Sequence, residues 1–354
     1  MTQKEIAEKL GVSPSIISRV LNGYTEGFKI TDDLRKRILD YVEEVGYRPN
    51  MVFSALKKQH VNLISILYYS RSSMSVGHTF DVIVDRAIRF FDEHQFETAF
   101  SFNCTPSETA RYHLPPWKCA GLLIPDANHL EKLSIVEESD IPYVTVNGIC
   151  GPRGTAVRAD EADSMEQIME HLVSNGHRKI AWIISCNDGQ KLSKIADARQ
   201  STFLACCQRY GAEPLLIHTM RHLGTDDCAG ANFIYPSKGV HFCYESPEFF
   251  LPFFKSGCTA AICDDAHIMP LLRWAHIGGY RIPDDLSVIC YNDKPLFRHT
   301  VPAITTFRIP AEEMGVTASQ ILLKKICGEP DHKKGETLCL KGNLVHRESV
   351  KRIN

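Results

Sequence analysis

Several features that define other classes of protein are missing from this sequence of 354 residues. No run of about 18 consecutive apolar residues occurs, which excludes a transmembrane helix and leads us to expect no membrane partner. The first residues are charged and amphipathic, so we expect no secretory signal. We therefore expect a cytoplasmic protein. Charge of one sign is not in excess either, because 40 Lys and Arg residues face 42 Asp and Glu residues. The length and the 44% hydrophobic content predict an ordinary globular protein of two or three domains.

The 13 cysteines lack the spacing of a metal site or of a disulfide framework. Their number is odd, no CxxC pair occurs, and none precedes Cys104. We therefore expect reduced thiols that fill the core, with no metal and no other cofactor. GxSxG, P-loop, HExxH and dinucleotide motifs are also missing, so we expect no catalytic residues and no enzyme activity.

The start of the chain carries the pattern of two short helices. Thr2 and Glu5 form a capping box for the first helix, and Gly11 ends it. Ser13 is a suitable N-cap for the second helix, with Pro14 at its first position. This pattern predicts a helix-turn-helix, whose second helix enters the major groove of DNA. Any two short amphipathic helices would look similar, so a purely structural helix pair is the alternative.

A third helix and a short segment follow. Thr31 can cap the third helix, acidic residues occupy its first turn, and Gly46 ends it. Asn50 can cap the next segment, MVFSALKKQ, where Val52 and Leu56 share one face. A helix of about eight residues is unstable alone, so this segment is expected to fold only when something packs on it. A disordered linker is the alternative.

Together these segments resemble the DNA-binding headpiece of the LacI/GalR transcriptional regulators. The resemblance rests on GVSPSIISRVLN, on a helix that ends in GYRPN, and on SALKKQ. It implies that the short segment is a hinge helix, which orders on operator DNA and pairs with its copy in a homodimer. Leu56 would then enter the minor groove as an apolar wedge that kinks the duplex.

Specific side chains of this headpiece are expected to contact double-stranded DNA. Arg19 can donate two hydrogen bonds to guanine, Ser15 can bond to several bases, and Ile16 can touch a thymine methyl. Residues 1–60 hold ten basic and eight acidic residues, a net charge of +2 against −4 for the remainder. The complete set of expected contacts is Thr2, Gln3, Ser13, Pro14, Ser15, Ile16, Ser18, Arg19, Asn22, Thr31, Tyr47, Asn50 and Leu56.

From about residue 61 the sequence alternates between buried strands and amphipathic helices. This alternation predicts an α/β fold of parallel sheets with helices on both faces, added to the N-terminal all-α domain. Strands are predicted over 61–68, 98–102, 121–125, 142–146, 179–184, 259–263 and 286–290, and helices over 80–91, 164–175, 195–208 and 268–276.

Motifs in this part resemble the effector-binding core of the same family, which is similar to periplasmic sugar-binding proteins. They are NGHRKIA, the Ala198–Arg199 pair, Asp264–Asp265, Tyr291–Asn–Asp293 and the terminal VHRES. The resemblance implies two lobes joined by crossovers near residues 158–161, 289–292 and 321–324. The implied domains are a headpiece (1–46), a hinge (47–60) and a core (61–354), with lobe 1 at 61–159 and 291–322 and lobe 2 at 160–290 and 323–354.

The same resemblance implies a small ligand between the lobes. An arginine fork and a carboxylate can bracket adjacent hydroxyls, so a carbohydrate is expected. A surface ion pair is the alternative for Arg199, and Asp293 can equally anchor a strand end or meet the ligand. The expected ligand contacts are Asn147, Arg199 and Asp265, with Ser72 and Phe80 as weaker candidates.

The expected function is that of a sequence-specific transcription regulator, in particular a repressor. It would bind a palindromic operator as a homodimer in the cytoplasm, in association with the bacterial nucleoid, and respond to a small effector. A cytosolic sugar-sensing or solute-binding protein without direct gene regulation is the alternative. The operator, the effector, the sign of its effect, and the choice between dimer and tetramer stay open.

Overall fold

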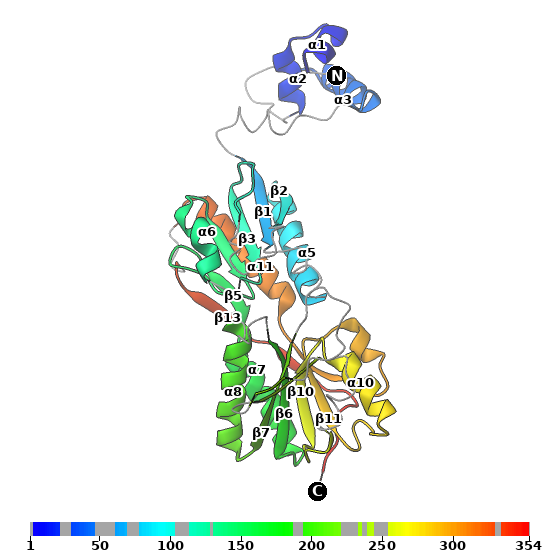
Figure 1. The fold of residues 1–354 in the computed structure, drawn as a ribbon. Helices are drawn as coiled ribbons and strands as arrows, with labels where there is room; N and C mark the ends of the chain where they lie inside the picture. Colours follow the sequence, from blue (N-terminus) through cyan, green and yellow to red (C-terminus); the bar gives the residue numbers. More distant parts are fainter. Residues whose placement is uncertain are drawn as a thin grey trace. The chain divides into compact units, whose positions relative to one another are not determined.

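The computed structural model divides into two compact units, residues 1–61 and 62–354 (Figure 1). It describes residues 3–21, 30–46, 61–68, 78–102, 113–127, 130–186, 194–220, 233–235, 239–243, 254–329 and 334–353. The predictions made for Thr2, Asn22, Tyr47, Asn50, Leu56 and Ser72 lie outside these residues.

The N-terminal unit contains helices α1 (Gln3–Leu10), α2 (Pro14–Leu21) and α3 (Asp32–Glu44). Gly11 ends α1 with a φ of +67°, a conformation that glycine adopts without a Cβ clash. The Thr31 hydroxyl caps α3 by accepting a hydrogen bond from the Leu34 amide at 3.3 Å. These local signals place the helices where the sequence predicted them.

One isoleucine from each helix packs at the centre of the core of this unit. Ile6, Ile17 and Ile38 are fully buried, and they belong to one hydrophobic cluster. Ile16, which was expected to touch a thymine methyl, is partly buried and packs against this cluster. The short helix therefore has a wider apolar face than its sequence pattern suggested.

The first lobe of the larger unit is a six-stranded parallel sheet in the order β13-β5-β4-β3-β1-β2. Helices α5 (His78–Glu93) and α11 (Ala311–Ile326) cover one face, and η2 (Leu130–Leu133) with α6 (Ser134–Glu138) lies on the other. The strands are β1 (Leu63–Tyr68), β2 (Glu97–Phe102), β3 (Gly121–Pro125), β4 (Tyr143–Val146), β5 (Ala156–Ala159) and β13 (Thr337–Leu340).

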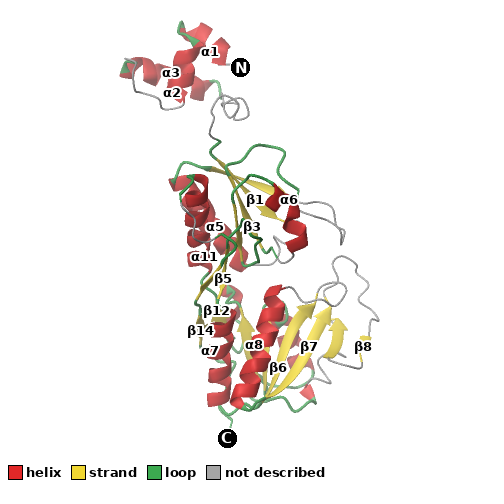
Figure 2. Ribbon diagram, turned by 90° about the vertical axis from the view of Figure 1, so that its left-hand side faces the viewer, coloured by secondary structure: helices red, strands yellow, loops and turns green. Residues whose placement is uncertain are grey.

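The second lobe is an eight-stranded sheet in the order β14-β12-β11-β10-β6-β7-β9-β8. Helices α7 (Glu161–Ser174) and α8 (Lys194–Tyr210) cover one face (Figure 2), and α10 (Ile268–Ile277; Figure 1) with η3 (Pro295–Arg298) covers the other. The strands are β6 (Lys179–Cys186), β7 (Glu213–Met220), β8 (Phe233–Tyr235), β9 (Gly239–Cys243), β10 (Ala260–Asp264), β11 (Ser287–Tyr291), β12 (Thr305–Arg308) and β14 (Asn343–Val345).

The chain crosses between the lobes after β5, after β12 and after β13. Two of the three predicted crossovers, near 289–292 and 321–324, are wrong, and so are the lobe boundaries that followed from them. Residues 305–308 pair with β11 in the second sheet, and residues 337–340 pair with β5 in the first. The order of motifs along a chain does not determine which sheet a strand joins, because strand pairing is a long-range contact.

These crossovers make the carboxyl edges of the two sheets face each other. β5 ends at Ala159, and α7 of the second lobe begins two residues later at Glu161. In the opposite direction, β12 ends at Arg308 and α11 of the first lobe begins at Ala311. Ligands of open α/β sheets bind outside the carboxyl ends of the strands, so these facing edges are where a site is expected.

The burial of the cysteines and the character of the helices can be compared with what the amino-acid composition predicts. Cys206, Cys207, Cys258, Cys263 and Cys290 are free and buried in the core, as predicted. Cys327 and Cys339 are exposed, so for these two the prediction of a core position is wrong. Burial raises the pKa of the Cys207 thiol to about 12, which keeps it protonated. Among the described helices, none combines the length and the apolar character needed to cross a bilayer.

Candidate functional site

Arg199 of α8 lies in a nearly buried network at the facing edges. Its Nε and Nη2 donate to the two carboxylate oxygens of Glu161 at 2.7 and 3.1 Å. The Arg199 and Glu161 side chains are only 12% and 5% exposed. The Tyr291 hydroxyl donates to the same carboxylate at 2.5 Å, and the guanidinium carbon lies 3.9 Å from the centre of the Tyr291 ring. The alternative of a surface ion pair for Arg199 is therefore excluded.

The electrostatics of this network fix the protonation of its members. Burial disfavours the charged form of Arg199, but Glu161, Tyr291 and Asp264 together outweigh burial and raise the pKa of Arg199. Burial, reinforced by the charge of Glu161, raises the pKa of Tyr291 well above its ordinary value. At neutral pH Arg199 is therefore a cation and Tyr291 is a neutral donor, which suits a bidentate, charge-assisted arrangement.

A second ion pair stands at the end of β10. The Asp265 carboxylate lies 2.9 Å from Nζ of Lys294, and the two side chains are 13% and 27% exposed. Burial and the neighbouring Asp264 raise the pKa of Asp265, while Lys294 opposes this change. Asp264 is itself 2.5 Å from Nδ1 of His267. The acidic pair singled out in the sequence is therefore held by basic partners from two directions.

Two asparagines follow strands at the facing edges in a left-handed conformation. Asn147 follows β4 with a φ of +51°, and Asn292 follows β11 with a φ of +78°. The Oδ1 atom of each is buried without a hydrogen-bond partner, which is rare for buried polar atoms. Nε of Arg158 is likewise buried and unpartnered, and the register that pairs Val146 with Val157 puts Arg158 beside Asn147. These atoms are suited to pair with a polar ligand.

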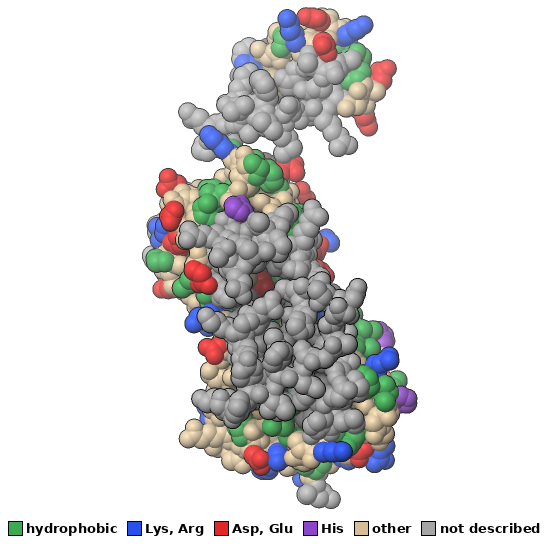
Figure 3. Space-filling model, in the orientation of Figure 1, with side chains coloured by type: hydrophobic (Ala, Val, Ile, Leu, Met, Phe, Trp, Pro, Cys, Tyr) green, Lys and Arg blue, Asp and Glu red, His purple; other side chains and the backbone are tan. Residues whose placement is uncertain are grey.

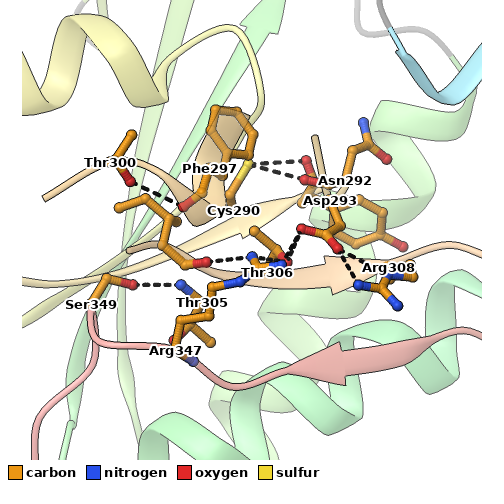
Figure 4. Close-up of polar contacts among 12 residues, drawn as sticks. Cys290, Asn292, Asp293, Phe297, Thr300, Thr305, Thr306, Arg308, Arg347 and Ser349 are labelled. Carbon is orange, nitrogen blue, oxygen red and sulfur yellow. Dashed lines mark hydrogen bonds and ion pairs between the residues drawn. The ribbon is translucent and has the colours of Figure 1, made fainter. Parts of the chain in front are cut away.

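Asp293 has a structural role, which decides between the two alternatives left by the sequence. Its carboxylate accepts hydrogen bonds from Thr306 at 2.8 Å, from Arg347 at 2.7 Å and from Arg308 at 2.9 and 2.6 Å (Figure 4). Arg347 also donates to the carbonyl of Ile304 at 2.7 Å. Asp293 therefore joins the loop after β11 to β12 and to the C-terminal segment.

The other predicted residues divide between exposed and packed positions. Ser13, Pro14 and Ser15 are exposed around the start of α2, where a helix-turn-helix would meet bases. Phe80, a weaker candidate for ligand contact, is 5% exposed and lies in the hydrophobic core, which assigns it to packing. The structure places the remaining described residues at these positions: Gln3 begins α1, Ser18 and Arg19 are partly buried on α2, and Thr31 caps α3.

Sequence patterns missed Glu161, Tyr291, Asn292 and Lys294 as site residues. Glu161 fell in a predicted crossover, before the helix predicted over 164–175, and Tyr291 was noted only as part of the motif that follows the strand predicted over 286–290. Asn292 belongs to the motif Tyr291–Asn–Asp293, in which the sequence pointed only to the charged Asp293 as a possible ligand contact. Only the register of distant segments brings these side chains to one edge.

Fold and site together define a class: a helix-turn-helix DNA-binding unit joined to a two-lobed ligand-binding domain. Residues 2–50 match the family described as bacterial regulatory proteins, lacI family, and residues 169–350 match the periplasmic binding protein-like domain. The chain belongs to the LacI family of bacterial regulatory proteins. It is accordingly a DNA-binding transcription regulator with an effector-binding domain, and not an enzyme.

Similar proteins extend over almost the whole chain. The HTH-type transcriptional regulator GalR of Streptococcus thermophilus is 26% identical over 337 residues, 92% of each chain. The transcriptional repressor PurR of Aliivibrio fischeri (strain MJ11) is 25% identical over 362 residues, 99% of this chain and 98% of the relative. The Lac repressor dimer bound to operator and an anti-inducer has a similar fold, with a TM-score of 0.74 and 19% identity over 99% of both chains.

Proposed function

We propose that this regulator is a repressor that binds a palindromic operator as a homodimer, and that a carbohydrate held between its lobes changes its affinity for DNA. The observation that carries the ligand part is that Asn147 follows β4 of the first lobe with a buried, unpartnered Oδ1 atom, while Asn292, Arg199 and Asp265 lie around the carboxyl ends of β10 and β11 of the second lobe. A structure similar in fold, the regulator CelR with cellobiose (TM-score 0.61, 19% identity, 99% of both chains), supports the choice of a carbohydrate.

The proposed chemistry is that of polyol recognition. Sugar hydroxyls can donate to the unpartnered Oδ1 atoms of Asn147 and Asn292, and they can also accept from Nε of Arg158. A ligand that contacts both edges would favour a closed arrangement of the lobes, since it gains its full set of hydrogen bonds only there. A change at the crossovers would then alter the spacing of two headpieces on DNA.

An exposed apolar surface on the second lobe supports the homodimer. Met269, Ile277, Leu296 and Val301 are 46%, 58%, 53% and 95% exposed. They belong to α10, to η3 and to the loop that follows it, on the side of the lobe where Figure 3 shows hydrophobic side chains. Large apolar side chains exposed on these elements favour a protein interface on this side of the lobe. A charge here, as in Val301→Asp, is expected to yield monomers in sedimentation experiments and to weaken operator binding.

The DNA part of the proposal concerns two residues of the helix-turn-helix and one residue of the segment that follows the headpiece. We assign base contacts to Ser15 and Arg19 of α2, and the minor-groove wedge to Leu56 in a hinge that orders on the operator. The protein would act on the bacterial nucleoid in the cytoplasm. The Lac repressor dimer bound to its operator, similar to this chain in fold, supports this assignment.

The experiment separates the two functions. The full chain is used to select genomic DNA fragments at physiological salt, and a carbohydrate library is screened for shifts in melting temperature. We expect one palindromic site, and a carbohydrate that both stabilises the protein and changes its affinity for that site. Leu56→Ala should weaken operator binding while the carbohydrate-induced stabilisation stays unchanged. Failure to select any preferred sequence would refute the regulator's operator specificity.

A further inference from the structure

The first and third crossovers leave the first lobe side by side. Asp160 forms the first crossover, between β5 and α7, and Lys341 with Gly342 forms the third, between β13 and β14. The Asp160 amide donates to the carbonyl of Leu340 at 2.8 Å. This bond extends the parallel pairing of β5 and β13, whose last register pair is Ala159 with Leu340. The two segments therefore enter the second lobe joined to each other.

One face of α7 holds the third crossover on the side of the second lobe. Asp163 and Gln167 are four residues apart, so their side chains share this face. The Asp163 carboxylate lies 2.8 Å from Nζ of Lys341. Nε2 of Gln167 donates to the Gly342 carbonyl at 3.2 Å, and Oε1 of Gln167 accepts from the Leu344 amide at 3.2 Å. β14 stands at the end of its sheet, so this amide side chain bonds to the edge of β14 as a neighbouring strand would.

The second crossover is joined to the third by strand pairing. β12 and β14 pair in antiparallel register, with Arg308 opposite Asn343. Gly342 lies so close to β12 that a Cβ atom would collide with the Arg308 carbonyl oxygen and with the Phe307 ring. α11 of the first lobe begins three residues after Arg308, at Ala311. A rotation of one lobe against the other therefore has to bend the three crossovers together.

The same helix carries a member of the candidate effector site. Glu161, which binds Arg199 and Tyr291, lies in the first turn of α7, two residues before Asp163. The Asp163 amide also donates to the side chain of Asp160 at 3.1 Å. Because backbone hydrogen bonds keep successive turns of a helix together, a displacement of Glu161 is passed along α7 to the face that holds the third crossover.

We infer that Gln167 is a positioning residue for the response of this regulator: it holds the third crossover to α7, so that the three crossovers move as one unit with the helix that carries Glu161. The inference rests on the proposed effector site. Gln167 contributes more than the pair of Asp163 and Lys341, because Lys341 is 74% exposed and solvent screens its charge.

A first experiment needs no effector. Hydrogen–deuterium exchange of the full chain is followed by mass spectrometry in peptides that cover residues 158–161, 307–311 and 340–344. Gln167→Met keeps a long side chain that favours a helix but removes both hydrogen-bonding groups. We expect exchange to become at least about fivefold faster in all three peptides. The first two contain no hydrogen-bond partner of Gln167 among the described residues, so their change measures the coupling.

Glu166→Gln is the matched control. Glu166 precedes Gln167 on the same helix, but it binds Arg209 and Tyr210 within the second lobe, at 2.5 Å each. It should leave exchange in the three peptides unchanged. Lys341→Met should accelerate exchange by less than about fivefold, and Lys341→Arg, which keeps the cation, should not accelerate it. Circular dichroism checks that each variant is folded.

A second experiment measures the response itself. The probes are the carbohydrates of the library, with cellobiose, D-ribose and D-galactose among them, and the DNA is the fragment that the parent selects. Gln167→Met should bind the probe and the DNA separately with affinities within about twofold of the parent, while the probe-induced change in DNA affinity falls at least about threefold. A purely structural role would lower the separate affinities instead.

Unchanged exchange of residues 158–161 and 307–311 in a folded Gln167→Met protein would overturn the inference. An undiminished response of that variant to the probe would overturn it as well, and would leave the proposed effector intact. If no member of the library bound to the parent, the proposed carbohydrate effector would be refuted and the role of Gln167 in its response with it. The exchange experiment would then still decide whether the three crossovers form one unit.

Discussion

The second lobe contains two carboxylate–arginine networks of similar composition in different places. Asp293 and Glu161 are 3% and 5% exposed, and each accepts hydrogen bonds from a guanidinium and from a hydroxyl. Asp293 joins β12 and the C-terminal segment inside one lobe. Glu161 stands two residues beyond the end of β5, at the edge that faces the other lobe.

The difference teaches that the same chemistry can serve stability or recognition according to its position. Around Asp293 two arginines and a threonine supply the donors, and the whole group lies within one lobe. Around Glu161 the network lies at the edge where unpartnered amide oxygens also occur. Loss of the first network should therefore affect unfolding alone, whereas loss of the second should affect both unfolding and ligand binding.

The largest effect is expected from Asp293→Ala. It leaves Arg347, only 13% exposed, without its carboxylate, and breaking a buried pair in this way costs about 3–5 kcal/mol. Urea unfolding measures the loss, and the exposed Asp284→Ala is the control, expected within about 1 kcal/mol of the parent. Equal stability of the two variants would contradict the anchoring role of Asp293.

A smaller pair of effects compares the two hydroxyls directly. Tyr291→Phe and Thr306→Val each remove one hydroxyl that donates to a buried carboxylate, at 2.5 and 2.8 Å, so each should cost about 1.5–3 kcal/mol. Calorimetric titration should show weaker effector binding for Tyr291→Phe alone. A loss of affinity in Thr306→Val as well would remove the distinction between the networks.

The pH dependence of stability should have opposite signs at two aspartates. Burial opposes ionisation of Asp293, but hydrogen bonds from Arg308 and Arg347 outweigh it and hold its pKa below the ordinary value of 3.8. Its contribution is therefore present above pH 3.8 and lost as the pH falls through the lowered pKa. The pKa of Asp265 is raised by burial and by Asp264, so its contribution is present at low pH and lost as the pH rises through the raised pKa.

Unfolding of Asp293→Asn and Asp265→Asn, compared with the parent at pH values below and above the ordinary carboxyl pKa of 3.8, measures these slopes. The advantage of the parent over Asp293→Asn should shrink on acidification, and its advantage over Asp265→Asn should shrink as the pH rises. If the two differences in stability changed with pH in the same direction, the pKa shift assigned to Asp293 or to Asp265 would be wrong.

The smallest effect is expected from Glu166→Gln. Its partner Arg209 is 63% exposed, and solvent screens such pairs, so the free energy of unfolding should change by less than about 1 kcal/mol. Thermal unfolding measures it. A loss as large as that of Asp293→Ala would mean that exposure does not explain the difference between the networks.

Much of the fold could be predicted from local sequence signals. Gly11, Pro14 and Thr31 set the ends of helices in the first unit, because capping and glycine or proline geometry depend on neighbours within a few residues. The buried strands were predicted from apolar runs in the same way. The α/β class and the helix-turn-helix follow from such patterns.

The sheet membership of later strands could not be predicted in this way. Residues 305–308 and 337–340 have no local feature that distinguishes the two sheets, and the family resemblance placed their crossovers too early. The site was predicted only in part for the same reason. Arg199 and Asp265 were identified from motifs, but their partners Glu161 and Lys294 were not.

The sequence by itself determined the helices of the headpiece, the alternation of strands and helices in the core, and the class of regulator to which they belong. Only the tertiary structure decided that Asp293 is an anchor and that Glu161 and Tyr291 hold Arg199. Glu161 is 38 residues from Arg199 and 130 residues from Tyr291 along the chain. The physical reason is that a helix end responds to its nearest neighbours, whereas a buried ion pair depends on the register of segments that meet only after folding.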